Sequence, residues 1–141
     1  MSQAYWDTNL FVYLHENHPV FRPMVENIYN FLAARNDTLC TSVFTVGEVL
    51  ALPIKMNDSQ AIASIRNSML GGDVDLLDFT LPMAERYAQI RATTALKAPH
   101  ALHLATAIEV QASLFVTNDH QLQRLQFPGK PLCLSLEGKI F

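Results

Sequence analysis

Two acidic residues lie where an α/β protein places its reactive groups. Asp7 follows the short apolar run Ala4–Trp6, and Asp119 follows Leu114–Thr117, a compact run of β-branched and aromatic residues. If both runs are parallel strands, the two carboxylates project from the same edge of the sheet, where ligands gather in such folds. Aspartate at this position is also a common helix cap that accepts hydrogen bonds from free backbone N–H groups. Position alone therefore leaves a structural and a chemical role open.

Glu48 is the third acidic candidate, and it lies about two turns into a predicted helix. Its neighbours Val46, Val49 and Leu50 are apolar. A glutamate in such surroundings either lies at the edge of an apolar stripe with its carboxylate in water, or points into a polar pocket at the strand ends. The local sequence is consistent with both arrangements.

The elements that must position these acids alternate between strand and helix. Short β-prone runs predict strands near residues 4–6, 38–41, 74–79, 114–117 and 132–134. Apolar spacing and capping residues predict helices near 19–35, 43–53, 59–70, 81–96 and 99–112, and a short helix after Asn118 and Asp119. Residues 10–14 fit a helix or a continued strand equally well. We therefore predict a single domain over residues 1–141, a three-layer α/β/α sandwich with a mostly parallel central sheet.

The composition excludes several classes of protein. Half of the 141 residues are hydrophobic and only 16% are charged, which excludes disorder and coiled coil. The formal charge of −3 provides no basic surplus for binding a phosphate backbone, so a nucleic-acid role needs another source of positive charge. Cys40 and Cys133 suggest buried thiols in a reducing compartment. With no membrane span or leader pattern in the sequence, we expect a cytoplasmic protein with no membrane association.

Four blocks of the sequence combine acidic, polar and apolar residues in a distinctive order: Tyr5–Leu10, Thr45–Leu50, Ala101–Ala107 and Leu114–Asp119. In order and spacing they resemble the signature blocks of the PIN-domain family. The similarity is greatest to the VapC-type toxins of bacterial toxin–antitoxin pairs, and it extends over nearly the whole chain. It implies a PIN-like fold and a metal-dependent ribonuclease that is restrained by an antitoxin protein.

The resemblance also implies roles for individual residues. Carboxylates within ~4 Å of one another repel by a few kcal/mol per pair, so an acidic cluster needs a proton or a divalent cation. Mg²⁺ or Mn²⁺ suits oxygen ligands, polarises a phosphodiester and activates water for hydrolysis of RNA. The cation also supplies positive charge within an acidic protein. By resemblance, the catalytic and metal-holding acids are Asp7, Glu48 and Asp119, with polar support from Asn9, Thr117 and Asn118.

One position departs from the PIN pattern. The family normally has an aspartate immediately before the block that begins at Ala101, and this chain has His100 there. His100 could be a metal ligand, which would favour Mn²⁺, iron or zinc over Mg²⁺. It could instead be protonated and pair with Asp7 or Asp119 in place of the cation, which would leave a binding or regulatory module. In a third arrangement the acids bind metal weakly without it.

Further hypotheses concern other functions and partners. A receiver-like phosphotransfer domain with Asp7 as phosphoacceptor fits the alternation of elements, but the chain lacks a glycine-rich phosphate loop. The high apolar content predicts a surface patch for association. The helix over 19–35 and the segment 50–69 are candidates for a homodimer face or an antitoxin groove, although core packing explains most of their apolar residues equally well. His103 is interpreted as a core-packing residue.

Overall fold

A five-stranded parallel sheet organises the part of the chain that the structure, a computed structural model, describes, which is residues 2–141. Every strand pairing in the sheet is parallel, and the strand order is β3-β2-β1-β4-β5. The predicted parallel sheet is confirmed. The strands are β1 (Gln3–Trp6), β2 (Thr38–Ser42), β3 (Asp75–Leu77), β4 (Leu114–Val116) and β5 (Leu132–Leu134).

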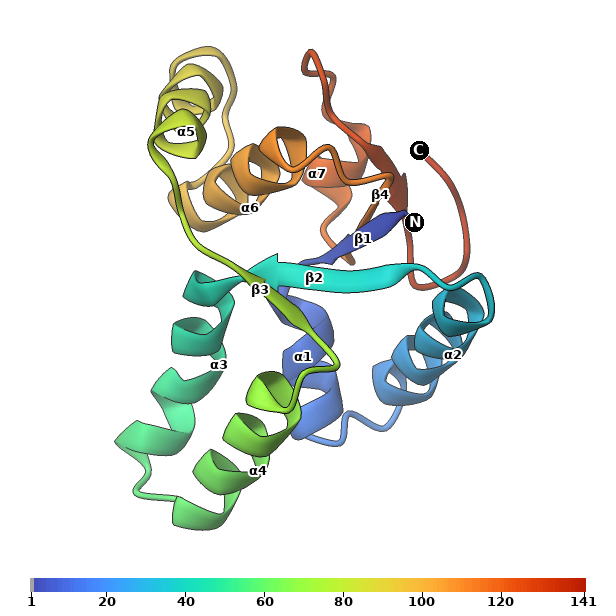
Figure 1. The fold of residues 1–141 in the computed structure, drawn as a ribbon, viewed down its shortest axis with the longest axis vertical. Helices are drawn as coiled ribbons and strands as arrows, with labels where there is room; N and C mark the ends of the chain where they lie inside the picture. The colour runs from blue at the N-terminus through green and yellow to red at the C-terminus, as the bar shows by residue number, and fades with distance from the viewer. Residues whose placement is uncertain (1) are drawn as a thin grey trace.

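Helices cover both faces of the sheet and complete the predicted three layers (Figure 1). One face carries α1 (Thr8–His15), α2 (Phe21–Ala34), α3 (Val43–Lys55) and α4 (Ser59–Leu70). The other face carries α5 (Leu81–Thr93), α6 (Ala98–Glu109) and α7 (His120–Arg124). Within residues 2–141, no helix is long and apolar enough to cross a membrane.

The alternation of side chains along the strands divides the core into two layers. Trp6 and Val116 are paired in register and pack with α1 to α4, whereas Tyr5 and Phe115 are paired and pack with α6. All four side chains are buried. A parallel strand that is covered on both faces needs apolar residues at successive positions, which explains why these runs do not alternate between apolar and polar residues.

Most predicted elements are confirmed, with differences at their ends. The sequence of residues 10–14 fits a helix or a continued strand equally well, and in the structure these residues belong to helix α1, whose first turn is capped by Asp7. The helix capped by Ser42 continues past Pro53 to Lys55. A proline in the last turn removes one hydrogen bond but leaves few later ones to disturb, so the helix ends a few residues beyond it. The helices α5 and α6 end earlier than predicted.

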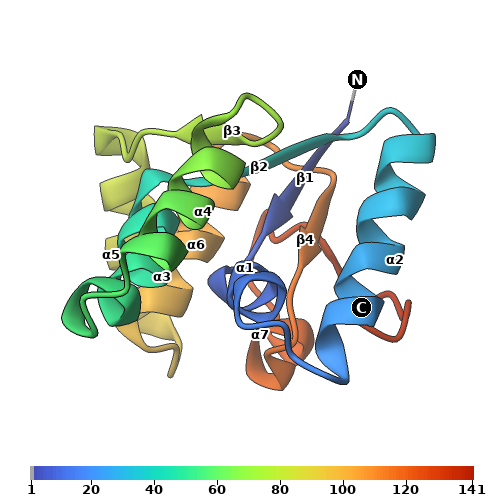
Figure 2. The same cartoon turned by 90° about the horizontal axis from the view of Figure 1, so that it is seen from below.

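The strand order reverses direction beside β1. From β1 the chain moves to β2 and β3 on one side, and it then crosses through α5 and α6 to β4 on the other side. Figure 2 shows β1 and β4 side by side, with α1 and α7 beginning beyond their carboxyl ends. A crevice at such a reversal is the usual ligand site of an open parallel sheet.

Candidate functional site

Asp7 is fixed at the junction of β1 and β4. Its backbone N–H donates to the carbonyl of Val116 at 3.0 Å, which extends the pairing of the two strands. Its Oδ1 accepts from the N–H of Thr8 at 2.8 Å and caps α1. Its Oδ2 accepts from Thr117 Oγ1 at 2.8 Å. The side chain is only 2% exposed, so protein donors rather than bulk water hold this carboxylate in place.

Asp119 lies beside Asp7 because both follow strands that end at the same edge. Its Oδ1 accepts from the N–H of Leu122 at 2.8 Å and caps α7. Its own N–H donates to Thr117 Oγ1 at 3.0 Å, so one threonine hydroxyl links the two acidic segments. Both aspartates are therefore helix caps, as the sequence allowed, and the positive ends of the helix dipoles stabilise their charges.

His100 contacts both aspartates from the first turn of α6. Its Nε2 lies 3.4 Å from Asp119 Oδ2, and its Nδ1 lies 3.8 Å from Asp7 Oδ2. These are ion-pair distances. Nδ1 is buried and has no hydrogen-bond partner among residues 2–141. The imidazole therefore occupies the space between the two carboxylates, where the PIN pattern leads one to expect an acidic residue.

Glu48 enters the site from the second turn of α3 and is held by two donors. Thr8 Oγ1 donates to its Oε1 at 2.5 Å, and His103 Nε2 lies 2.8 Å from the same oxygen. Burial raises the pKa of Glu48, but the hydrogen bonds from His103 and Thr8 and the electrostatic influence of the two nearby histidines lower it by more. The pKa of the carboxyl group consequently lies below its usual value, which favours the charged form.

The three acids proposed from the sequence thus meet at one edge, where histidines connect them. His100 contacts Asp7 and Asp119, and His103 contacts Glu48 at 2.8 Å and Asp7 at 4.0 Å. Of the three residues proposed as polar support, Thr117 bonds to both aspartates. The amide of Asn118 donates instead to Tyr13, and among the hydrogen bonds of residues 2–141 none joins the side chain of Asn9 to these acids. The catalytic and metal-binding roles remain predictions.

Sequence reasoning assigned no role in this site to three residues that belong to it: Tyr5, Thr8 and His103. His103 is buried as expected for a core residue, but its two ring nitrogens contact Tyr5 and Glu48. The available signal was its position three residues after His100, which places both histidines on the same helix face.

The chemical types of these donors, although not their present spacing, suit a divalent cation that accepts both oxygen and nitrogen. It offers three carboxylates and the unpartnered Nδ1 of His100. Within residues 2–141, no three His, Cys, Asp or Glu side chains are grouped closely enough to hold a metal ion together. Mg²⁺ and Mn²⁺ commonly use one or two carboxylates and complete their shells with water and substrate phosphate, so a small protein ligand set is adequate.

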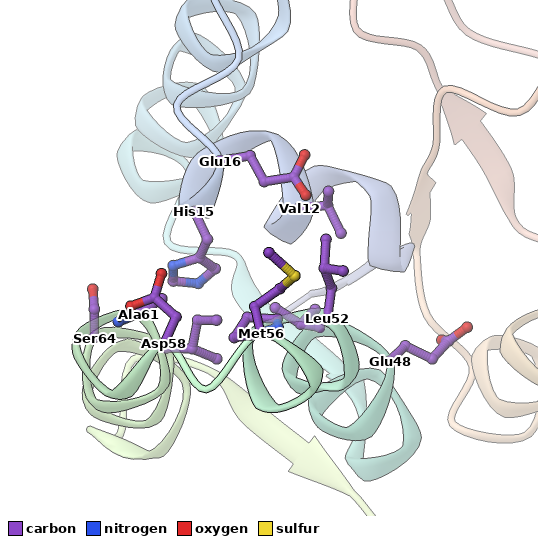
Figure 3. Close-up of a pocket in the computed structure, with 12 residues that line it drawn as sticks. Val12, His15, Glu16, Glu48, Leu52, Met56, Asp58, Ala61 and Ser64 are labelled. Carbon is purple, nitrogen blue, oxygen red and sulfur yellow. Dashed lines mark hydrogen bonds between the residues drawn. The ribbon is translucent and has the colours of Figure 1, made fainter.

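A cavity of about 440 Å³ runs between α1, α3 and α4. Figure 3 shows Glu48 at one end of it, with its carboxylate pointing away from the cavity. The lining combines apolar side chains such as Val12, Leu52 and Met56 with acidic Glu16 and Asp58. This arrangement gives a groove lined by apolar and acidic side chains that ends beside the candidate site.

Comparison with solved structures identifies the fold. The chain is similar to VapBC2 of Rickettsia felis bound to a promoter DNA fragment, with a TM-score of 0.76 and 21% identity over 94% of this chain and 98% of that one. A toxin–antitoxin complex of Klebsiella pneumoniae gives a TM-score of 0.66 and 24% identity, over 89% of this chain and 93% of that one. VapC20 of Mycobacterium tuberculosis, described as a sarcin-ricin loop cleaving toxin, gives a TM-score of 0.64 and 15% identity, over 79% of this chain and 86% of that one.

The family itself is assigned from the sequence. No curated protein matches the chain significantly. The family model for the PIN domain matches residues 4–128, a range that includes all four resembling blocks and the three acids. Because this match extends over most of the chain and the solved structures share its fold, this protein belongs to the PIN domain family.

Proposed function

We propose that this PIN domain is a divalent-metal-dependent endoribonuclease, the toxin of a type II toxin–antitoxin pair. The observation that carries the proposal is the convergence of Asp7, Glu48 and Asp119, from three separate elements, at the reversal point of the sheet. The similarity to solved toxin–antitoxin proteins supports it, and so does the membership of the PIN family.

The chain's own residues would hold the ion and the RNA phosphate in place. Asp7, Glu48 and Asp119 provide oxygen ligands, and His100 provides a nitrogen ligand that favours Mn²⁺ over Mg²⁺. When bound there, a divalent cation would supply polarisation of the phosphodiester, a water of lowered pKa and stabilisation of the leaving oxygen. The Thr117 hydroxyl holds the carboxylate of Asp7 and the backbone of Asp119, so it links the two acidic segments.

An antitoxin is the proposed protein partner, and the groove between α1, α3 and α4 is its proposed docking site. The groove is lined by apolar side chains together with acidic Glu16, Glu48 and Asp58. This chemistry fits an apolar peptide segment that also carries basic side chains. An antitoxin bound there would approach the acids and hinder access of RNA.

We also propose a homodimer, formed through exposed apolar side chains of α2. Tyr29 and Phe31 are 44% and 51% exposed on the helix over 21–34, where a solvated face is normally polar. Sedimentation analysis checks this proposal. Sedimentation of a monomer alone at high concentration would contradict it.

RNA cleavage by purified protein tests the main proposal. Structured RNA is incubated with Mn²⁺ or Mg²⁺, and with EDTA as a metal-free control. Glu48→Gln, prepared in the same way, controls for contaminating nucleases. We expect cleavage by the wild-type protein that needs the metal and is lost in Glu48→Gln. Equal cleavage by both proteins, or by neither with any divalent ion, would contradict the proposal.

A second candidate function is a binding or regulatory module without catalysis. The contacts of His100 favour it, since an imidazole lies between the two aspartates at ion-pair distances. Calorimetry with Mn²⁺ separates the two functions. If His100→Asp binds the metal and the wild-type protein does not, the module is the correct interpretation, whereas binding by the wild-type protein supports the nuclease.

A further inference from the structure

A chain of hydrogen bonds links the core of the protein to Glu48. Tyr5 Oη lies 2.6 Å from His103 Nδ1, and His103 Nε2 lies 2.8 Å from Glu48 Oε1. Tyr5 is fully buried and His103 is 1% exposed, whereas the side chain of Glu48 is 24% exposed. This series of hydrogen bonds therefore begins in the core between β1 and α6 and ends at the edge of the sheet.

The neighbouring groups set the direction of these hydrogen bonds. The backbone N–H of Ser42 donates to the phenolic oxygen of Tyr5 at 3.2 Å, and burial raises the pKa of the phenol, so the hydroxyl keeps its proton. A carboxylate oxygen only accepts, so the contact of 2.8 Å between His103 Nε2 and Glu48 Oε1 indicates that Nε2 carries a hydrogen and donates it to Glu48. In the tautomer with its hydrogen on Nε2, Nδ1 accepts from the Tyr5 hydroxyl.

Packing fixes the first two members of this chain. The Tyr5 ring stacks on Phe115 at a centroid distance of 5.3 Å and contacts the His103 ring at 5.8 Å. A hydroxyl and an imidazole are costly to bury unless each polar atom has a partner. In this core both ring nitrogens of His103 have partners, and the second partner is the carboxylate of the candidate site.

The hydrogen bonds occupy only one oxygen of Glu48. Oε1 accepts from Thr8 and His103, and among the hydrogen bonds of residues 2–141 none involves Oε2. A carboxylate held by one oxygen presents the other in a fixed direction. Hydrogen-bonded partners of this kind orient metal-ligating carboxylates and increase their affinity for the ion.

We infer that Tyr5 and His103 are positioning residues that hold Oε1 of Glu48 and so present its Oε2 to the divalent cation. The inference rests on the proposed function, because it takes Glu48 as a metal ligand. Neither residue touches the ion or the RNA. Both act through the orientation of the Glu48 carboxylate.

Metal affinity without RNA is the first test. Mn²⁺ is titrated into the purified protein, and free Mn²⁺ is followed by electron paramagnetic resonance. We expect Tyr5→Phe and His103→Leu to weaken binding about 10- to 100-fold, the effect usual for lost outer partners of metal ligands. His103→Gln should recover part of the affinity, since its amide N–H can still donate to Glu48.

A matched variant separates positioning from general loss of stability. Ile90 is fully buried in the same core layer and makes no hydrogen bond to Tyr5 or His103. Ile90→Val therefore loosens the core but leaves the hydrogen bonds from Tyr5 to Glu48 intact. We expect its Mn²⁺ affinity to equal that of the wild type. Wild-type affinity in both Tyr5→Phe and His103→Leu, or an equal loss in Ile90→Val, would overturn the inference.

The tautomer of His103 is an independent test on the wild-type protein. Nitrogen-15 spectra of histidine-labelled protein, assigned by the signal lost in His103→Gln, should show the hydrogen on Nε2. A hydrogen on Nδ1 would reverse the direction of the chain and overturn the inference. If the wild type binds Mn²⁺ and the variants weaken that binding but no RNA is cut, the proposed function fails and the positioning role stands. A wild-type protein that binds no Mn²⁺ overturns the positioning role.

Discussion

Replacing Thr117 with valine should destabilise the protein strongly, although the two side chains have nearly the same shape. The Thr117 hydroxyl is fully buried, donates to Asp7 Oδ2 at 2.8 Å and accepts from the N–H of Asp119 at 3.0 Å. Asp7 is only 2% exposed, so water has little access to the oxygen that loses its donor. A lost hydrogen bond to a charged group costs about 1.5–3 kcal/mol, and the lost bond from Asp119 adds about 0.5–1 kcal/mol.

The expected loss is therefore about 2–4 kcal/mol of the free energy of unfolding, a large part of the roughly 5–15 kcal/mol typical of a domain. Urea denaturation in EDTA measures it, with the fluorescence of Trp6, the single tryptophan, as the signal. Thr117→Ser is the matched control, because it keeps the hydroxyl and removes one methyl group, at a cost of about 1 kcal/mol. If Thr117→Val unfolds at the same urea concentration as the wild type, or is more stable than Thr117→Ser, the reasoning is refuted.

Three further predictions concern Glu48, Cys40 and the groove. The pKa of Glu48 lies below its usual value of 4.5, so its contribution to stability is complete above that pH and disappears as the pH falls through the lower folded-state pKa. Glu48→Gln should therefore be less stable than the wild type at about pH 6 and similar to it at about pH 2 in urea titrations with EDTA. A difference in the free energy of unfolding that does not change with pH would contradict this. Burial raises the pKa of Cys40 to about 12, so a thiol reagent should label it at neutral pH only after unfolding, and rapid labelling of the native protein would show the thiol to be accessible. Leu52→Glu in the groove should weaken the affinity for a basic, apolar antitoxin peptide, measured by calorimetry, about tenfold or more. The control is Ile54→Glu, which is equally exposed on the same helix but outside the groove and should leave the affinity unchanged. Equal effects of the two variants would reject the groove as the docking site.

The sequence predicted the architecture well because its signals are local. Helical spacing, caps such as Ser42 and Asp58, and the glycine pair after α4 define elements within a few residues. Their alternation with short apolar runs is enough to predict a parallel sheet between helices. Residues 10–14 were ambiguous because their apolar run fits two periodicities, and the hydrogen bond from Thr8 to the Asp7 cap helps to settle them as helix.

The contacts inside the site were less predictable, because they join residues far apart in the sequence. Tyr5 and His103 are 98 positions apart, and nothing local indicates that the hydroxyl of one meets the ring of the other. The same holds for Thr8 and Glu48, which are 40 positions apart. His100 attracted attention only because it departs from a familiar pattern, and the choice between its possible roles depends on distances that a sequence does not contain.

The hydroxyl of Thr117 and the carboxylate of Asp7 are separated by 110 positions along the chain. Asp7 is therefore synthesised long before Thr117, which becomes available only after β4 has been made. Until then a nascent polypeptide lacks the hydroxyl that donates to Asp7 Oδ2, however early α1 and α2 fold. If the proposed activity is correct, polypeptides that end before β4 lack both Thr117 and Asp119 and should not cleave RNA.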